Sequence, residues 1–477
     1  MKKFIGILAV LFFGGAATAQ TGLQGTWEGR LSVGTNSLRL VIHIKGEEGV
    51  YAATLDSPDQ GAKGIPVSSV KRTGDSLYLE VAAAAARLSG KITSDSTLAA
   101  QWQQGGAASP IELKKTTATT NTAAAPNRPQ TPVPPFPYSS KDVTYHNSGQ
   151  SIQFGATVTK PFGNGPYPAV LLITGSGPQN RDEELMGHKP FAVIADDLTK
   201  RGFLVLRVDD RGVGQTTGDH RSATSKDFAE DAKAGLAYLR SLPEVDKRKI
   251  GLLGHSEGGM IAQMVGAEEK DLLFIMLLAA PGIPITELMT LQNEAVLLAA
   301  GAEKEAVNEY LKLYRQLISA LAFAPAEGAE KLTNELLNNW IKKTPKEKVA
   351  ATTGITDEAS KQKWAASFSR QVTHPWFKFF LQYNPDDYVK KLTAKVLALN
   401  GDKDVQVTSS ANLSGLRASL KKSKSPKYDI VTLEGLNHLF QRCTKCSVQE
   451  YGELEETISP VALEAIGTWL VKEIKNK

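Results

Sequence analysis

Cysteine is almost missing from this chain, which has two among its 477 residues, Cys443 and Cys446. Their C-x-x-C spacing is half of a zinc site, but no second pair of Cys or His completes it, so the sequence predicts no metal and no other cofactor. In an oxidising compartment the two are expected to form a local disulfide, with a free or redox-active thiol pair as the alternative.

The chain also has a small net charge and few long apolar runs. The formal net charge of +5 falls to 5 − 2 = +3 without Lys2 and Lys3, which is too little to favour a nucleic acid or an anionic membrane surface as partner. Beyond residue 19, no apolar run approaches the roughly 20 residues that span a bilayer. A small-molecule substrate is the expected partner, from the catalytic motifs described below, and the oligomeric state stays open.

The first 19 residues have the three regions of a secretory signal peptide. Two lysines precede an apolar stretch over residues 4–13, and Ala17-Thr18-Ala19 stands directly before Gln20. The apolar stretch is too short to remain as a membrane span. We therefore expect a mature protein that begins at Gln20 and is exported to the periplasm or the medium.

The rest of the chain divides by pattern. Residues 20–115 contain short alternating segments separated by turn residues, which predicts a small antiparallel β domain, a barrel or a sandwich, although the alanine run 82–86 favours helix. This domain either binds a ligand or is a structural appendage. Residues 116–138 are rich in Thr, Ala and Pro and indicate an extended linker. From residue 139 to 477, strands and helices alternate, which predicts a doubly wound, mostly parallel α/β sheet.

A helical insertion is expected over residues 285–390 of this second domain, where it would form a cap that limits access to a site. Five aromatic residues gather near its end, and they either line a pocket or belong to the core. They are Trp376, Phe377, Phe379, Phe380 and Tyr383.

The most specific motif is Gly254-His255-Ser256-Glu257-Gly258. A short apolar run precedes it and a helical pattern follows, so the context is strand, G-x-S-x-G and helix. This is the arrangement of a nucleophile elbow, in which a sharp turn lifts the serine hydroxyl clear of the chain. The flanking glycines are needed because a Cβ at either position would collide as strand and helix close up. Ser256 is therefore the candidate nucleophile.

A serine hydroxyl needs a base, and the order Ser, Asp, His along the chain places the partners near the C-terminus. With seven histidines in the chain, His438, which follows the last predicted strand, is preferred by elimination, and His188 is the rival. The acid is expected at the turn after the strand 395–400. Asp404 is preferred there over Asp402, which is more typical of a turn residue that caps its own backbone.

Two backbone N–H groups should face the developing oxyanion. One is that of Glu257, which follows the nucleophile. The other should come from the Gly-rich loop after the strand 169–173, where Ser176 is preferred and Gly175 is the neighbouring choice.

Taken together, four segments resemble the EstD-like bacterial α/β-hydrolases, carboxylesterases related to the serine aminopeptidase and dienelactone hydrolase branches. They are 173–184 (ITGSGPQNRDEE), 187–191 (GHKPF), 208–214 (VDDRGVG) and 254–258 (GHSEG). The resemblance covers about residues 140–472. It implies the α/β-hydrolase fold, an ester-hydrolysing activity and a triad of Ser256, Asp404 and His438. It also implies that Asp209-Asp210-Arg211-Gly212 is mainly architectural.

The resulting hypothesis is a secreted serine esterase that works through an acyl-enzyme. A serine peptidase of the aminopeptidase type, using the same triad on amides, is the alternative. A binding protein whose hydrolase fold has lost its activity is a third possibility, to be tested by ligand retention on the isolated 20–115 fragment.

Overall fold

The computed structural model describes residues 22–475, except for 34–35, 48–49, 59–61, 82–85, 105–106, 117–126, 148 and 150. The predicted signal peptide and most of the alanine run therefore lie outside the described residues. The chain divides into two compact units, Met1–Thr122 and Ala123–Lys477. Across the described part of both units, no helix combines the length and the apolar character that a membrane span requires.

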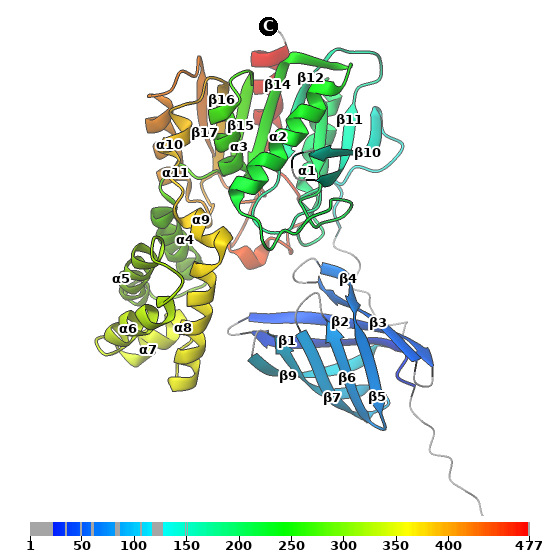
Figure 1. The fold of residues 1–477 in the computed structure, drawn as a ribbon, viewed down its shortest axis with the longest axis vertical. Helices are drawn as coiled ribbons and strands as arrows, with labels where there is room; N and C mark the ends of the chain where they lie inside the picture. The colour runs from blue at the N-terminus through cyan, green and yellow to red at the C-terminus, as the bar shows by residue number, and fades with distance from the viewer. Residues whose placement is uncertain are drawn as a thin grey trace, which may run out of the picture. The chain divides into compact units, whose positions relative to one another are not determined.

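The N-terminal unit is all-β, as predicted. Its antiparallel sheet has the order β4-β3-β2-β1-β9-β8-β7-β6-β5. The edge strands β4 and β5 are joined by the single residue Ser68, so the sheet curls round on itself (Figure 1). Alternate side chains point inward to a core that includes Trp27, Leu88 and Leu113. The strands are β1 (Gly25–Val33), β2 (Asn36–Glu47), β3 (Val50–Ser57), β4 (Ala62–Val67), β5 (Ser69–Thr73), β6 (Ser76–Val81), β7 (Ala86–Ser94), β8 (Thr97–Gln104) and β9 (Ala107–Thr116).

The second unit is built on a sheet of order β10-β11-β13-β12-β14-β15-β16-β17. The pairs β10·β11 and β11·β13 are antiparallel, and every later pair is parallel. The sheet is therefore mostly parallel, as the alternation of strands and helices predicts. Its strands are β10 (Ser139–Asn147), β11 (Ile152–Lys160), β12 (Tyr167–Ile173), β13 (Leu204–Val208), β14 (Val245–His255), β15 (Phe274–Leu278), β16 (Lys395–Gly401) and β17 (Tyr428–Leu433).

Helices cover both faces of this sheet because its strands are apolar on both sides. Leu171 of β12 packs into the core beneath α2 (Ser225–Ser241), α3 (Glu257–Glu268) and α11 (Ser409–Leu420). Its neighbours Val170 and Leu172 face the opposite core, formed with α1 (Pro190–Lys200) and α12 (Pro460–Leu470). Figure 1 shows α2 in front of the sheet and the red C-terminal helix behind it.

Seven helices lie between β15 and β16, the region of the predicted insertion. In α5, buried residues such as Val307, Tyr310, Leu311 and Tyr314 recur at helical spacing, so one face of the helix packs inward. The seven helices are α4 (Ile285–Ala299), α5 (Lys304–Leu321), α6 (Ala329–Ile341), α7 (Lys346–Thr353), α8 (Glu358–Thr373), α9 (Pro375–Leu381) and α10 (Asp386–Val389).

The last part of the predicted linker is bound to the second unit. Arg128 donates to the carbonyl oxygens of Met186 and Gly452 at 3.0 and 2.8 Å. The side-chain oxygen of Gln130 accepts from the amides of Thr457 and Ile458. The composition of residues 116–138 does not indicate this docking, because it depends on backbone groups that lie from 58 to 328 residues further along the chain.

Candidate active site

Ser256 stands at the turn between β14 and α3, with φ 54° and ψ −120°. This is a sparsely populated conformation for a residue with a side chain, of the kind found at functional sites. A Cβ on Gly254 would lie 2.1 Å from the carbonyl oxygen of Gly258, and a Cβ on Gly258 would lie 2.1 Å from that of Ile173. The close approach of strand and helix thus requires glycine at both positions, as the motif predicts.

His438 follows β17 and is hydrogen-bonded to Asp404, which follows β16. The distance from His438 Nδ1 to Asp404 Oδ2 is 2.8 Å, and both side chains are almost fully buried. The second carboxylate oxygen, Oδ1, accepts from the amides of Gln406 and Val407, each at 2.8 Å. With Nδ1 donating to Asp404, the other ring nitrogen of His438, Nε2, is left to accept a proton.

The two rival residues are engaged elsewhere. Asp402 accepts from the amide of Gly435 and pairs with Lys403, on the outer side of the turn. His188 is buried, with Nδ1 at 3.0 Å from the Thr457 hydroxyl and Nε2 at 2.9 Å from the Tyr451 carbonyl oxygen. Burial lowers the pKa of His188 to about 4, so this histidine is a neutral bridge within the fold at physiological pH.

Ser256 and His438 line one cavity of about 280 Å³, together with the residues predicted to form the oxyanion hole. The amide of Gly175 donates to Glu183 Oε1 at 2.7 Å, so it is already bonded. Among the described residues, no hydrogen-bond acceptor is found for the amides of Ser176 and Glu257. The geometry therefore favours Ser176 over Gly175 as the second donor.

The aromatic residues at the end of the insertion divide between the two expected places. Trp376, Phe377 and Phe380 of α9 line the cavity, whereas Phe379 packs against the core and Tyr383 is buried. The other lining residues are mostly apolar or neutral, and none is Lys or Arg. They include Leu185, Leu288, Met289, Gln292, Gln406, Val407 and Leu439.

The side chain of Glu257 has a role that the motif does not indicate. It is buried, and its Oε1 accepts from the Ser225 hydroxyl at 2.5 Å and from Trp376 Nε1 at 2.8 Å. Burial raises the pKa of Glu257, although hydrogen bonds from Ser225, Trp376 and Ser176 oppose the shift. Glu257 thus connects the elbow to α9 and to the loop after β12.

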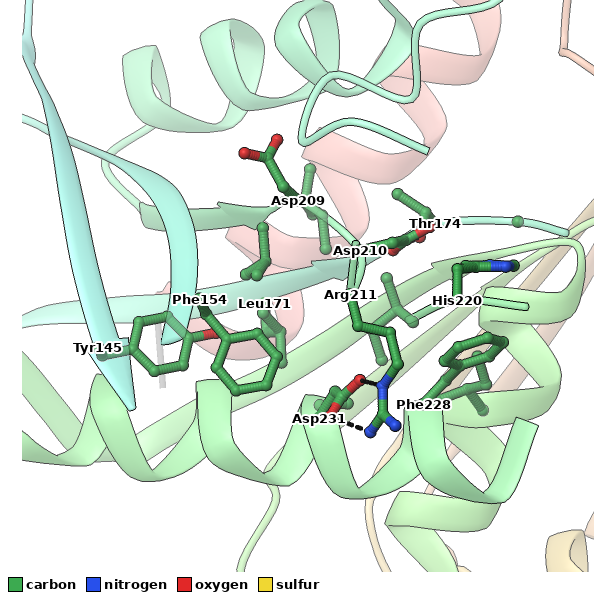
Figure 2. A pocket seen from close by; sticks show the side chains of 16 residues that line it. Tyr145, Phe154, Leu171, Thr174, Asp209, Asp210, Arg211, His220, Phe228 and Asp231 are labelled. Carbon is green, nitrogen blue, oxygen red and sulfur yellow. Dashed lines mark hydrogen bonds and ion pairs between the residues drawn. The ribbon is translucent and has the colours of Figure 1, made fainter. Parts of the chain in front are cut away.

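Two aspartates that follow β13 form hydrogen bonds and an ion pair with the loop after β12. Asp209 pairs with Arg181 at 2.7 Å, and Asp210 accepts from the Thr174 hydroxyl and the Gln179 amide at 2.7 and 2.8 Å. Burial raises the pKa of Asp210 to about 8. Figure 2 shows Asp210 beside Thr174, at the edge of a second cavity. These contacts agree with the architectural role that the resemblance implies for this segment.

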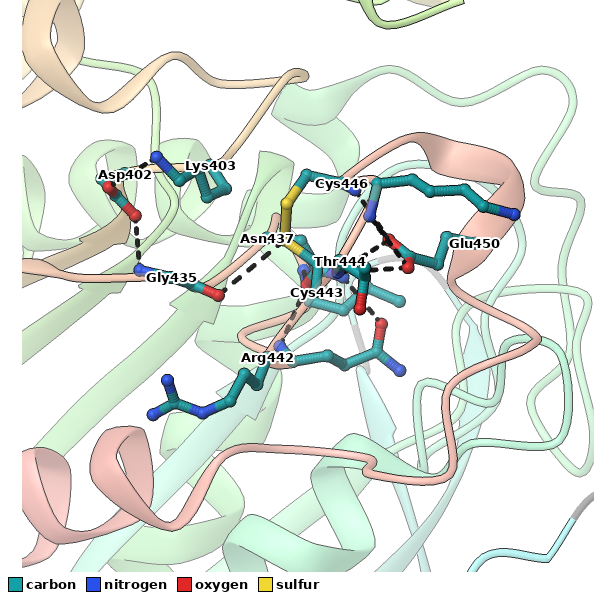
Figure 3. Close-up of a disulfide and its surroundings, with 12 residues drawn as sticks. Asp402, Lys403, Gly435, Asn437, Arg442, Cys443, Thr444, Cys446 and Glu450 are labelled. Atoms are coloured by element: carbon teal, nitrogen blue, oxygen red, sulfur yellow. Dashed lines mark hydrogen bonds and ion pairs between the residues drawn. A yellow bond between two sulfur atoms is a disulfide. The ribbon is translucent and has the colours of Figure 1, made fainter.

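The loop after His438 carries the disulfide Cys443–Cys446 (Figure 3). The carboxylate of Glu450 accepts from the amides of Thr444, Lys445 and Cys446 at 2.7 to 3.2 Å. The disulfide and the carboxylate together hold one compact turn close to the histidine.

Comparison with known proteins places this geometry in a family. The model of the serine aminopeptidase S33 family (Hydrolase_4) matches residues 188–441, more than half of the chain. The chain belongs to this family. The S33 match includes the elbow, Asp404 and His438.

Among curated proteins, this S33-family chain is 24% identical to esterase EstD of Thermotoga maritima over 344 residues, which cover 71% of the chain and 69% of EstD. Among solved structures, it resembles Est1E of Butyrivibrio proteoclasticus with bound ferulic acid, with a TM-score of 0.40 and 18% identity over 70% of the chain and 99% of Est1E. It also resembles the esterase Pf2001 of Pyrococcus furiosus, with a TM-score of 0.42 and 16% identity over 71% of the chain and 91% of that protein. The family match and the EstD relative confirm the predicted EstD-like α/β-hydrolase and the prediction of a hydrolytic enzyme.

Proposed function

We propose that this S33-family protein is a secreted serine esterase that hydrolyses neutral carboxylic esters, with Ser256 as nucleophile, His438 as base and Asp404 as the orienting acid. One observation carries the proposal. The Asp404–His438 pair opens on the cavity into which the strained elbow presents Ser256. Nucleophile, base and orienting acid are the three parts that acyl transfer to serine requires.

In the proposed reaction, Ser256 Oγ bonds to the ester carbonyl carbon while its proton moves to His438 Nε2. The amides of Ser176 and Glu257 stabilise the oxyanion, and each such donor is worth about 10²- to 10³-fold in kcat. The bond to the alkoxy oxygen then breaks, and His438 protonates the leaving alcohol. Water attacks the acyl-enzyme and gives its proton to His438, which returns it to Ser256 as the carboxylic acid leaves.

The charges around the cavity favour an ester over a peptide with a free amino terminus. An aminopeptidase has to bind the ammonium group of its substrate, for which a carboxylate without another partner is the natural ligand. Two carboxylates line the cavity. Glu183 is bonded to His255 and Gly175, and Glu257 is bonded to Ser225 and Trp376. With no Lys or Arg in the lining, a neutral substrate fits best.

The insertion is proposed to act as a cap that shapes the acyl site. Leu288 and Met289 of α4 and Phe377 and Phe380 of α9 contribute an apolar wall. Such a wall suits an apolar acyl chain or an aromatic ring, whose burial contributes about 25 cal/mol per Å². The ester group itself would lie at Ser256, where the wall ends and the backbone donors begin.

Export is proposed from the composition of residues 1–19 and from the disulfide. Disulfides persist in oxidising compartments and are rare in the reducing cytosol. The Cys443–Cys446 bond supports a periplasmic or extracellular location. Fractionation of the native host, with the N-terminus of the mature protein determined by mass spectrometry, tests this part. An N-terminus at Gln20 is expected, and a cytosolic protein with residues 1–19 retained would contradict it.

The decisive experiment profiles the purified protein on p-nitrophenyl esters of increasing acyl length and on aminoacyl-p-nitroanilides. We expect turnover of the esters, little or none of the anilides, and labelling of Ser256 by a fluorophosphonate probe. Ser256→Ala should lower kcat by about three or more orders of magnitude while the far-UV circular dichroism stays unchanged. A folded wild-type protein that is not labelled at Ser256 would overturn the proposal. Faster turnover of the anilides would favour the peptidase.

A further inference from the structure

A second histidine–carboxylate pair lies directly beside the first. His255 Nδ1 is 3.0 Å from Glu183 Oε1, and His255 Nε2 is 3.0 Å from the backbone carbonyl oxygen of His438. The rings of His255 and His438 lie with their centroids 4.9 Å apart. His255 and Glu183 are largely buried, with exposed fractions of 7% and 5%.

The hydrogen bonds determine where the protons are. The carbonyl oxygen of His438 can only accept, so His255 Nε2 carries a proton. An ionised Glu183 has no proton to donate, so its Oε1, which accepts from the Gly175 amide at 2.7 Å, also accepts from His255 Nδ1. Both ring nitrogens of His255 therefore donate, and the pair is an imidazolium with a carboxylate.

The surroundings agree with this assignment. Burial by itself lowers the pKa of His255, but the charge and hydrogen bond of Glu183, the carbonyl of His438 and the charge of Asp404 raise it above its ordinary value overall. Phe440, whose ring centroid is 6.3 Å from that of His255, is the other ring packed against it. Because the pair is neutral as a whole, it adds no net charge beside His438.

The pair joins the two loops that have to act together. On one side, Glu183 holds the amide of Gly175, the residue before the proposed oxyanion donor Ser176. On the other side, His255 holds the main chain of His438, whose imidazole is the proposed base. His255 itself precedes Ser256 in the elbow. One chain of three hydrogen bonds thus runs from the oxyanion loop through the elbow to the base.

The backbone of Glu183 has an energetically unfavourable conformation. It has φ 51°, which is uncommon for a residue with a side chain. Such strain persists where surrounding contacts over-determine it and is concentrated at functional sites. The buried carboxylate is thereby aimed at Gly175 and His255 and not at solvent.

We propose that Glu183 and His255 are positioning residues that set the oxyanion loop and the base against Ser256, through the contacts with Gly175 and with the His438 carbonyl. This inference rests on the proposed function. It adds a role for a residue of the G-x-S-x-G motif that does not touch the substrate's reacting bond. A displacement of either loop by about 1 Å would cost about 10²-fold in kcat, because acyl transfer depends steeply on alignment.

Two substitutions of His255 separate the two contacts. The amide nitrogen of Asn overlies Nδ1 of a histidine, so His255→Asn keeps a donor for Glu183 and loses the one for His438. The amide nitrogen of Gln overlies Nε2, so His255→Gln keeps the donor for His438 and loses the one for Glu183. We expect each to lower kcat about 10- to 100-fold with KM within about threefold of the wild-type value.

Substitutions of Glu183 provide the rescue test. Glu183→Ala removes the acceptor of both donors and should lower kcat to a similar degree. Glu183→Gln keeps an oxygen for the Gly175 amide but removes the charge that raises the pKa of His255, so it should restore only part of that loss. The double variant Glu183→Ala/His255→Gln should be no slower than the poorer single variant, because both substitutions break the same hydrogen bond between Glu183 and His255. Glu184→Gln, in the same loop, is the matched control.

All rates are measured per active site, titrated with a fluorophosphonate probe, so that unfolded protein does not count. The inference is overturned if the wild type hydrolyses esters and the titrated variants keep its kcat, change only KM, or lose activity additively. It is also overturned if Glu183→Gln is as slow as Glu183→Ala. A folded wild type that neither labels nor turns over esters overturns the proposed function together with this inference, so the two failures are distinguishable.

Discussion

The exchange of Asp404 for asparagine tests the proposed triad most sharply, because its local contacts dictate the outcome. Oδ1 of Asp404 accepts two amide hydrogens, from Gln406 and Val407, each at 2.8 Å. In Asp404→Asn the amide oxygen has to take that place, since an NH₂ group there would face two other donors. The NH₂ group is then forced towards His438 Nδ1, where the Oδ2 oxygen accepts at 2.8 Å in the wild type.

The consequence is a wrong tautomer of the base. Facing a donor, Nδ1 of His438 must accept, and its proton moves to Nε2, the nitrogen that should deprotonate Ser256. A change of this kind lowers kcat about 10⁴-fold while the geometry stays intact. At about 1.36 kcal/mol for each factor of ten, the transition state loses about 5 kcal/mol.

The assay is the initial rate of hydrolysis of a short p-nitrophenyl ester at neutral pH, per mole of folded protein judged by circular dichroism. Asp402→Asn is the control two residues away. Its carboxylate accepts from Gly435 and pairs with Lys403 without reaching His438, so kcat should stay close to the wild-type value. If Asp404→Asn kept more than a tenth of the wild-type kcat, or if Asp402→Asn were the slower of the two, the reasoning from the tautomer would be refuted.

Three further predictions concern stability. Trp376→Phe keeps an aromatic side chain but removes the donor to the buried Glu257 carboxyl, and should lower the free energy of unfolding by about 1.5 to 3 kcal/mol in urea titrations. An unchanged free energy of unfolding would mean that this hydrogen bond contributes nothing. The pKa of His188 falls from 6.5 to about 4 on folding, so the folded state binds fewer protons in that range and loses stability as the pH drops through it, by up to about 3 kcal/mol. The stability advantage of wild type over His188→Gln should therefore shrink between pH 7 and pH 4, and a constant difference would contradict the shift. Replacing Cys443 and Cys446 by serine opens a loop with a sequence separation of only 3 and should lower the free energy of unfolding by about 2 kcal/mol or less; a larger loss, by the same titration, would show that the bond does more than close this small loop.

The parts of the site that are local in the chain were open to prediction. Strand, turn and helix follow one another within residues 250–265, so the elbow and Ser256 depend on contacts between near neighbours. The two glycines are a direct sequence signal of the elbow, because only residues without a side chain permit the close backbone contacts at Gly254 and Gly258. The mostly parallel sheet was predictable for the same reason. The helical period of 3.6 residues and the strand period of two are both visible in short segments, and their alternation along the chain predicts the sheet.

The choice between close alternatives was harder. Asp402 and Asp404 stand in one turn, and the sequence prefers Asp404 without excluding Asp402. The backbone of that turn directs Asp404 inward to His438 and leaves Asp402 on the outer side. Likewise, Ser176 is favoured over Gly175 because the amide of Gly175 is bonded to Glu183, a contact between residues 8 apart in a loop without periodic structure.

By itself, the sequence determined the class of chemistry and the sheet that carries it, because strand and helix periods, the glycines of the elbow and the order of Ser, Asp and His are written along the chain. Only the tertiary structure decided what surrounds them. His255 meets Glu183 across 72 residues, and Glu257 meets Trp376 across 119. Such contacts leave no pattern in a single sequence, because they depend on how separate segments pack together. Any carboxylate in the chain could accept these hydrogen bonds, and only the fold brings one of them within reach.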